Sequence, residues 1–185
     1  DTNKPASSGV LYDLVSKETI IDWKKNTNEL FNLALQNCDG VKMQALRDCK
    51  DEVDVFMFYS TNDSASFACN FEKNCIVQFS SDENSSYGEF GSILAVPNLG
   101  SVFVTPLNKG LINKAIAQIA EKTIRFYNDD PGKISYKLFW YYKNEWKTLE
   151  MHLQNDGIII YLPNSLVDLI RISLENNDPI FLKGI

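Results

Sequence analysis

The stretch ISYKLFWYYKNEWKTLEMHLQNDGIIIYL, residues 134–162, decides the fold. It contains three runs rich in aromatic and β-branched residues, separated by Asn144 and by the dipeptide Asp156-Gly157. Residues of these types favour strands, and an Asp-Gly dipeptide favours a tight turn between two antiparallel strands. The stretch therefore predicts a three-stranded antiparallel meander.

Two-residue loops at 144–145 and 156–157 would pair Trp140 with Leu149 and Leu153 with Ile160. Because side chains alternate along a strand, any loop of even length keeps the same side chains together, whereas a three-residue loop would exchange the faces. One face is then a core face, made of Tyr136, Leu138, Trp140, Leu149, Met151, Leu153, Ile160 and Leu162. The opposite face is aromatic with a few charges, made of Lys137, Phe139, Tyr141, Trp146, Thr148, Glu150, His152, Ile159 and Tyr161.

The rest of the chain alternates between helical and strand periods. Helices are expected at 16–37 with an interruption at 26–28, at 111–127 after a cap at Asn108, and at 165–176. A short helical turn is expected within 39–49, and strands at 53–61, 64–71, 74–81, 92–96, 101–105 and 179–185, with a polar loop at 80–91. These elements predict an α+β fold: a mostly antiparallel sheet of two meanders, with an N-terminal helix, a central amphipathic helix and a C-terminal helix packed on it. Residues 1–9 are expected to be a disordered tether and 10–185 a single domain.

Four cysteines occur, at positions 38, 49, 69 and 75. Sequence separation favours disulfides Cys38–Cys49 and Cys69–Cys75, the second across a hairpin of strands 64–71 and 74–81. The spacings differ from the usual Cys-x2–4-Cys of a zinc site, and no Cys-x-x-Cys redox motif occurs. Four free thiols in a cytosolic protein is the alternative. Two disulfides would place the protein in an oxidising compartment, periplasmic or secreted.

Charge and hydropathy restrict the partners. The chain has 185 residues, a net charge of −6 and three arginines, which does not suit a phosphate backbone. No apolar run is long enough for a transmembrane segment. The polar start DTNKPASSG is typical of a chain from which a signal peptide has been removed. These features favour a protein partner, for instance a basic one, over nucleic acid.

The aromatic face of residues 137–161 holds the candidate binding residues. Tyr and Trp bring rigid apolar area with a polar tip, so they are favoured at interfaces. We take Phe139, Tyr141, Trp146, Glu150 and His152 as a binding site. Burial of the three rings under the helix at 111–127 or at 165–176 would be the alternative.

Catalytic motifs are absent from the sequence. His152 is the only histidine, and Glu150 points the same way on the expected strand, so an acid–base pair is geometrically available. No cofactor or metal motif occurs. The sequence therefore favours a non-enzymatic, exported protein-binding module, such as an inhibitor or immunity-type protein that occludes its partner. The alternatives are an exported small-ligand- or lipid-binding domain with a cleft between the second meander and a helix, or a hydrolase using Glu150 and His152.

Overall fold

The computed structural model describes residues 17–24, 26–37, 44–59, 68, 70–72, 74, 85–154 and 157–174. The chain divides into two compact units, residues 1–39 and 40–185. The tether expected at 1–9 and the closing strand expected at 179–185 lie outside the described residues. The single domain expected over 10–185 stays a prediction, and the two units are described separately.

The first unit contains two short helices, α1 (Lys17–Asp22) and α2 (Thr27–Asn37). The break between them falls where the interruption was expected. Lys24, with φ 52°, ends the turn after α1. Asn26 Oδ1 then accepts a hydrogen bond from Glu29 N at 2.9 Å, and Asn26 N donates to Glu29 Oε2 at 3.0 Å. These reciprocal bonds form a capping box, which satisfies backbone N–H groups at the start of α2.

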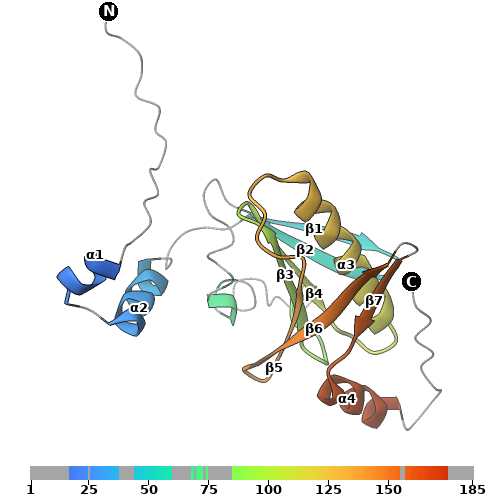
Figure 1. Cartoon of the computed structure of the whole chain (residues 1–185). Helices are drawn as coiled ribbons and strands as arrows, with labels where there is room; N and C mark the ends of the chain where they lie inside the picture. Colours follow the sequence, from blue (N-terminus) through green and yellow to red (C-terminus); the bar gives the residue numbers. More distant parts are fainter. Residues whose placement is uncertain are drawn as a thin grey trace, which may run out of the picture. The chain divides into compact units, whose positions relative to one another are not determined.

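The second unit is built on a seven-stranded antiparallel sheet with the order β1-β2-β4-β3-β5-β6-β7 (Figure 1). Together with the helices, this confirms the α+β class. The strands are β1 (Gln44–Lys50), β2 (Val53–Tyr59), β3 (Ser92–Asn98), β4 (Ser101–Pro106), β5 (Leu138–Tyr142), β6 (Glu145–Gln154) and β7 (Gly157–Tyr161). The helices are α3 (Ile112–Asp129) and α4 (Asn164–Leu174).

The segment 44–50 corrects the sequence prediction, because it is a strand and not a helical turn. β1 pairs with β2 from Gln44–Tyr59 to Lys50–Val53 across a tight turn at Asp51-Glu52. Both turn residues have positive φ, 53° and 67°, which is the conformation that suits the right-handed twist of a hairpin. Six of the seven side chains of β1 are exposed, so the strand has no alternating apolar pattern to detect.

The hairpin expected at 64–81 is also wrong where it can be examined. The described residues Ala68, Asn70, Phe71, Glu72 and Asn74 have helical backbone, drawn as a short green helix in Figure 1. The neighbours of β2 in the sheet are β1 on one side and β4 on the other. The expected meander of β2 with two strands from residues 64–81 is therefore wrong, since both edges of β2 are already paired. The two cysteines of this stretch, Cys69 and Cys75, lie outside the described residues.

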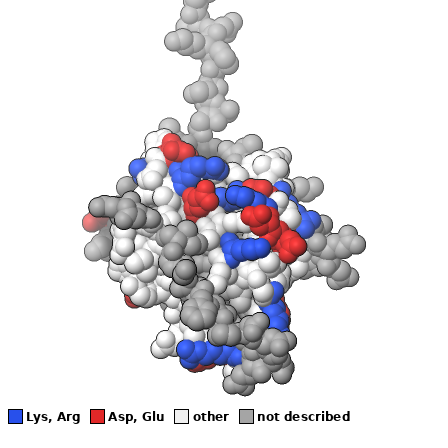
Figure 2. Space-filling model, turned by 90° about the vertical axis from the view of Figure 1, so that its right-hand side faces the viewer, with Lys and Arg blue, Asp and Glu red and all other residues white. Residues whose placement is uncertain are grey.

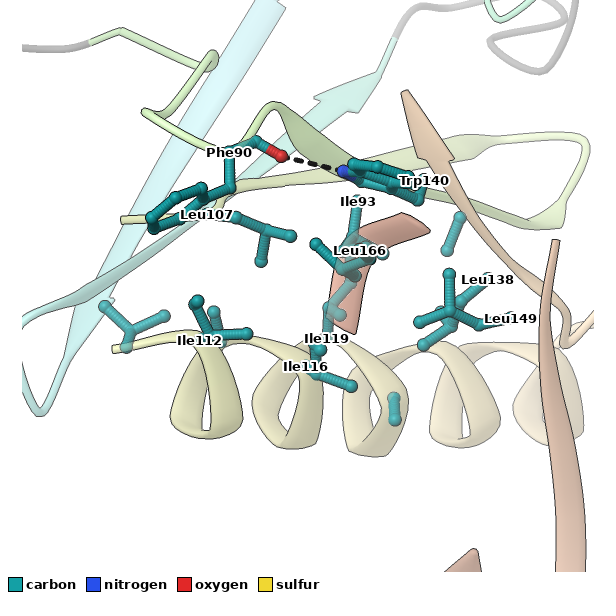
Figure 3. Packing of buried hydrophobic residues seen from close by; sticks show 14 of the residues in the cluster. Phe90, Ile93, Leu107, Ile112, Ile116, Ile119, Leu138, Trp140, Leu149 and Leu166 are labelled. Carbon is teal, nitrogen blue, oxygen red and sulfur yellow. Dashed lines mark hydrogen bonds between the residues drawn. The ribbon is translucent and has the colours of Figure 1, made fainter. Parts of the chain in front are cut away.

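The core lies between one face of the sheet and the helices α3 and α4. Figure 3 shows Ile112, Ile116 and Ile119 of α3 pointing toward the sheet, with Leu166 of α4 nearby. In the same layer Trp140 Nε1 donates a hydrogen bond of 2.7 Å to the backbone oxygen of Phe90. The sheet contributes a row of fully buried or nearly buried side chains to this layer: Val53, Val55, Ile93, Ala95, Phe103, Leu138, Trp140 and Leu149.

The start of α3 differs from the expectation. Asn108 does not cap the helix; its side-chain oxygen accepts a hydrogen bond from Glu89 N at 3.2 Å. Leu111 precedes the first helical residue and gives no side-chain cap. The helix ends at Asp129, two residues beyond the expected end, and α4 starts at Asn164, one residue before the expected start.

The second meander has the two faces that the sequence predicts, although both turns lie one residue earlier. The first turn is Lys143-Asn144, with φ 47° and 64°, so Trp140 pairs with Lys147 and Leu138 with Leu149. In the second hairpin Met151 pairs with Ile160, not with Leu162. Each pairing moves by two residues, an even number, and every side chain therefore stays on its predicted face.

Candidate binding surface

The five predicted binding residues lie on the sheet face opposite α3 and α4. Phe139 and Tyr141 come from β5, and Trp146, Glu150 and His152 come from β6. Both helices pack with the other face, since Leu138, Trp140 and Leu149 share one core cluster with Ile119, Leu166 and Ile170. The three aromatic rings are therefore not covered by α3 or α4, which was the alternative to binding.

An aromatic cluster forms at the turn between β5 and β6. Tyr141 and Trp146 are direct cross-strand partners, with ring centroids 4.6 Å apart. Phe71 packs edge-on against both rings, at 5.2 Å from Tyr141 and 5.1 Å from Trp146. Tyr87 adds a further edge contact with Tyr141 at 6.2 Å. Trp146 lies on the solvent-facing side of this cluster, with 43% of its surface exposed, whereas Tyr141 is 5% exposed.

Burial holds the Tyr141 ring in place and also favours the neutral, protonated form of its phenol. Burial raises the pKa of the Tyr141 phenol, and the negative charge of Glu72 raises it further. The neutral hydroxyl donates a hydrogen bond of 2.8 Å to Asn144 Oδ1, in the turn that joins β5 to β6. Tyr141 is therefore a support beneath Trp146, and it does not itself reach a partner.

The outer end of the same face is open. Glu150 and His152 on β6 are exposed, and Glu150 pairs with Tyr161 on β7. The His152 ring stands edge-on to the Tyr161 ring, with centroids 5.4 Å apart. Tyr161 is 54% exposed, so it presents the second large aromatic surface on this face.

We call the exposed side chains of this face the open strip: Trp146, Thr148, Glu150, His152 and Tyr161. Residues 146 and 152 are six positions apart on one strand, which corresponds to about 20 Å. The strip has an aromatic residue at each end and a carboxylate between them. Such a surface is suited to contact with another macromolecule through its rings.

Two contributors were not among the predicted binding residues. Tyr161 joins the strip through the β6–β7 pairing. Because it alternates with Ile160, the sequence already indicates that Tyr161 lies on the face opposite the core. Phe71 supports Trp146 from a segment more than 70 residues earlier, and nothing in the sequence indicates that contact. Phe139, one of the predicted residues, is half-buried against the buried cluster of Phe56, Phe58 and Leu94.

Glu150 and His152 do not form an organised acid–base pair in the structure. They are two residues apart on one strand and share a face, but the ring of His152 packs against Tyr161. In the described part of the chain, no three metal-ligating side chains come together.

Cys49 is exposed on β1 and forms no disulfide with another described residue. Asp54 holds the pKa of the Cys49 thiol above its ordinary value, chiefly because its carboxylate accepts a hydrogen bond from the S–H group. Cys38, Cys69 and Cys75 lie outside the described residues. The two disulfides thus stay predictions, and the structure gives no support to the Cys38–Cys49 bridge.

Charged side chains of both signs are intermixed on the face shown in Figure 2. Two ion pairs lie in the β1 region: Arg47 with Asp54 at 2.7 Å, and Lys122 of α3 with Asp48. The described side chains in this view form no area of a single sign. In the described ranges, none of the helices has the length and apolarity that a membrane crossing requires.

Comparisons with known proteins give no further guide, since no family model, curated protein or solved structure matches this chain.

Proposed function

We propose that this chain is an exported protein-binding module that uses the open strip to cover a site on another protein, in the manner of an inhibitor or immunity protein. The observation that carries the proposal is the exposure of β6. Its four successive outward side chains, Trp146, Thr148, Glu150 and His152, are all exposed, and α3 and α4 pack on the other face of the sheet.

The energy available from the two aromatic ends is sufficient to anchor an interface. Covering the exposed parts of Trp146 and Tyr161 would contribute on the order of 2 kcal/mol each, from the apolar area removed from water. Phe71 and Tyr141 hold the Trp146 ring from behind, so little side-chain freedom is lost when a partner covers it. Preorganised aromatic rings of this kind are typical binding hot spots.

Charge favours a basic partner. The chain carries −6 overall, and Glu150 lies in the middle of the strip. A lysine or arginine of the partner that reached Glu150 would lie beside the Tyr161 ring, the cross-strand neighbour of Glu150, where partial exclusion of water strengthens the attraction. Export of the protein depends on the predicted disulfides and is tested separately below.

The ligand-binding alternative has less support. It requires a cleft between the second meander and a helix, yet the side chains there belong to the close-packed core. Leu138, Leu149 and Leu166 are fully buried at that position. The hydrolase alternative requires His152 to act with Glu150, and it predicts that His152→Ala abolishes a measurable hydrolysis.

The test is a pull-down from an extract of the source organism with the purified protein as bait. We expect a basic protein to bind the wild type and to be lost with Trp146→Ala. Trp23→Ala is the matched control, because Trp23 is also a half-exposed tryptophan, 52%, but lies in the other unit. Capture that is equally strong with both variants would contradict a role for the strip.

A second variant separates loss of contact from loss of folding, because Trp146 also packs on Phe71. His152→Ala removes an exposed ring from the other end of the strip and is expected to cost less than 0.5 kcal/mol of stability, as surface changes usually do. Weaker capture by a fully folded His152→Ala protein would support the proposal. Retention of capture in both strip variants would refute it.

A further inference from the structure

The two edges of the described sheet differ in chemistry. β1 forms one edge and carries Arg47, Asp48 and Lys50, the kind of charged side chains that keep an edge strand from pairing with other chains. β7 forms the other edge with the sequence GIIIY, which has no charge and no proline. Alternate backbone N–H and C=O groups of β7 point away from β6, and the described residues place no strand there.

We propose that two copies of this chain dimerise by antiparallel pairing of β7 with β7, about a two-fold axis through Ile159. In this register Ile159 faces its own counterpart, Ile158 faces Ile160 of the second copy, and Gly157 faces Tyr161 of the second copy. The two sheets then continue into one another, and every contact occurs twice, as an isologous interface requires.

The seam is self-complementary on the face that carries the open strip. Tyr161 is a large ring, 54% exposed, and its partner in the second copy is a glycine. Gly157 has no side chain, so the ring can lie across it. The same face brings the two Ile159 side chains together on the axis, in the kind of β-branched cross-strand pair that stabilises sheets.

On the helix face, the pairing extends an apolar row across the seam. Leu153 of β6 pairs with Ile158 of β7, and Met151 pairs with Ile160. In the dimer the row runs from Leu153 through Ile158 to Ile160 and Met151 of the second copy. Leu153 lies on the core face beside Ile158 and is 55% exposed, so the row has an apolar and partly open side at this position.

A second copy is favoured as the occupant because the uncharged strand is complementary to itself. All five residues of β7 are uncharged, so no like charges meet when the strand faces itself. A charged partner strand would gain no ion pair from them. In the dimer the two open strips lie on the same side of one continuous sheet, and Tyr161 of each strip packs in the seam while the β6 side chains Trp146, Thr148, Glu150 and His152 stay outside it.

The oligomeric state of the full chain tests the proposal. Size-exclusion chromatography with light scattering is expected to give about 42 kDa, twice the chain mass of 21.0 kDa. Ile159→Lys places two ammonium groups face to face on the axis and should give the monomer mass. Leu46→Lys makes a similar apolar-to-lysine change at the other edge of the sheet and should leave the dimer intact.

A cysteine at the axis provides a test that does not depend on weakening the fold. Directly opposed residues of antiparallel strands have Cα atoms about 4.5–5.5 Å apart, within the range that a disulfide spans. Ile159→Cys in a Cys49→Ser background should form a covalent dimer on mild oxidation. Ile172→Cys on α4, an exposed position away from β7, is the control, and the Cys49→Ser parent shows any linkage by the remaining cysteines.

A monomer at every concentration, or a dimer unaffected by Ile159→Lys and not linked by Ile159→Cys, would overturn the proposal. Neither measurement involves a partner protein. Failure of the pull-down would therefore leave the dimer intact, and a monomeric protein could still bind its partner through Trp146.

Discussion

Tyr141 and Trp146 face each other across the β5–β6 turn as a direct antiparallel pair, one ring buried and the other half-exposed, with centroids 4.6 Å apart. The pair is bound to the turn itself, because the Tyr141 hydroxyl donates to Asn144 Oδ1. The position of the exposed ring therefore depends on a buried hydroxyl. This relation connects the stability of the hairpin to the shape of the open strip.

Removal of that hydroxyl should weaken the hairpin without removing the ring. Tyr141→Phe keeps the contacts with Phe71 and Trp146 but loses the bond to Asn144, and we expect a loss of about 1 kcal/mol in the free energy of unfolding. Urea denaturation measures it. Tyr161→Phe, at an exposed tyrosine of the same face, is the control and should change stability by less than half as much. Equal effects would contradict a special role for the buried hydroxyl.

The same residue predicts a loss of stability in alkaline solution. Burial raises the pKa of Tyr141 in the folded state above the value of about 10 that it has in the unfolded chain. The unfolded state therefore loses its proton first as the pH rises, and stability present below pH 10 falls above it. The slope of unfolding free energy against pH above 10 should be smaller in Tyr141→Phe than in the wild type. Identical slopes would show that other groups govern alkaline unfolding.

The ion pair between Asp48 and Lys122 joins β1 to α3 and gives the opposite pH dependence. The hydrogen bond from Lys122 lowers the pKa of the Asp48 carboxyl below its ordinary value. The contribution is thus present above about pH 4 and is lost as the pH falls through the folded pKa. The pair is largely exposed, so we expect Asp48→Asn to have a small effect at neutral pH, decreasing with added salt. An effect that grows with salt or with acid would be inconsistent with the ion pair.

The thiol chemistry decides the proposed location of the protein. Two disulfides predict that the native protein, purified without reductant from its own source, takes up no alkylating reagent until it is reduced. Cys49 is the sensitive site, because it is exposed on β1. Mass spectrometry after alkylation, with Cys49→Ser as the control for that position, gives the answer. Alkylation of Cys49 without reductant would contradict the predicted Cys38–Cys49 disulfide. Alkylation of all four thiols would contradict both disulfides and the argument for export that depends on them.

Most of the sheet could be predicted from the sequence, and the exceptions have physical reasons. The faces of β5, β6 and β7 follow from alternation and survive the shifted turns, because both loops remain even in length. β1 was missed because an edge strand protected by charges lacks an apolar period. The sequence predicts the first turn one residue too late, at 144–145, because lysine rarely adopts the positive φ that Lys143 has in the structure.

The candidate site was predictable only along single strands. Trp146, Glu150 and His152 alternate on β6, so the sequence places them together. Phe71, in contrast, reaches Trp146 through tertiary packing of a helical turn, and residue period carries no information about such contacts. Contacts of this kind decide which ring is buried and which is exposed. The burial of Tyr141 therefore cannot be predicted from the sequence and is seen only in the structure.

Two glycines with nearly the same positive φ give the sharpest test of the packing near Tyr141. Gly91 has φ 81° and Gly110 has φ 79°, so alanine at either site meets the same conformational penalty of about 1–2 kcal/mol. The space differs: a Cβ at Gly91 would lie 2.1 Å from the backbone oxygen of Tyr141, whereas a Cβ at Gly110 would meet nothing within 4 Å. Gly91 is also buried in the turn that leads into β3, next to Tyr141.

Gly91→Ala should therefore lower the free energy of unfolding more than Gly110→Ala does. The expected difference is about 1–3 kcal/mol, which is typical of overpacking a tight site. Because the clash is with the backbone of β5, relief would require movement of the strand that carries Tyr141. Urea denaturation of both variants gives the difference directly, and the conformational penalty cancels. Tryptophan fluorescence, to which Trp23 and Trp140 also contribute, should change in Gly91→Ala and stay unaltered in Gly110→Ala. Equal stability of the two variants would mean that β5 does not lie against Gly91, and the support proposed for the exposed tryptophan would lose its basis.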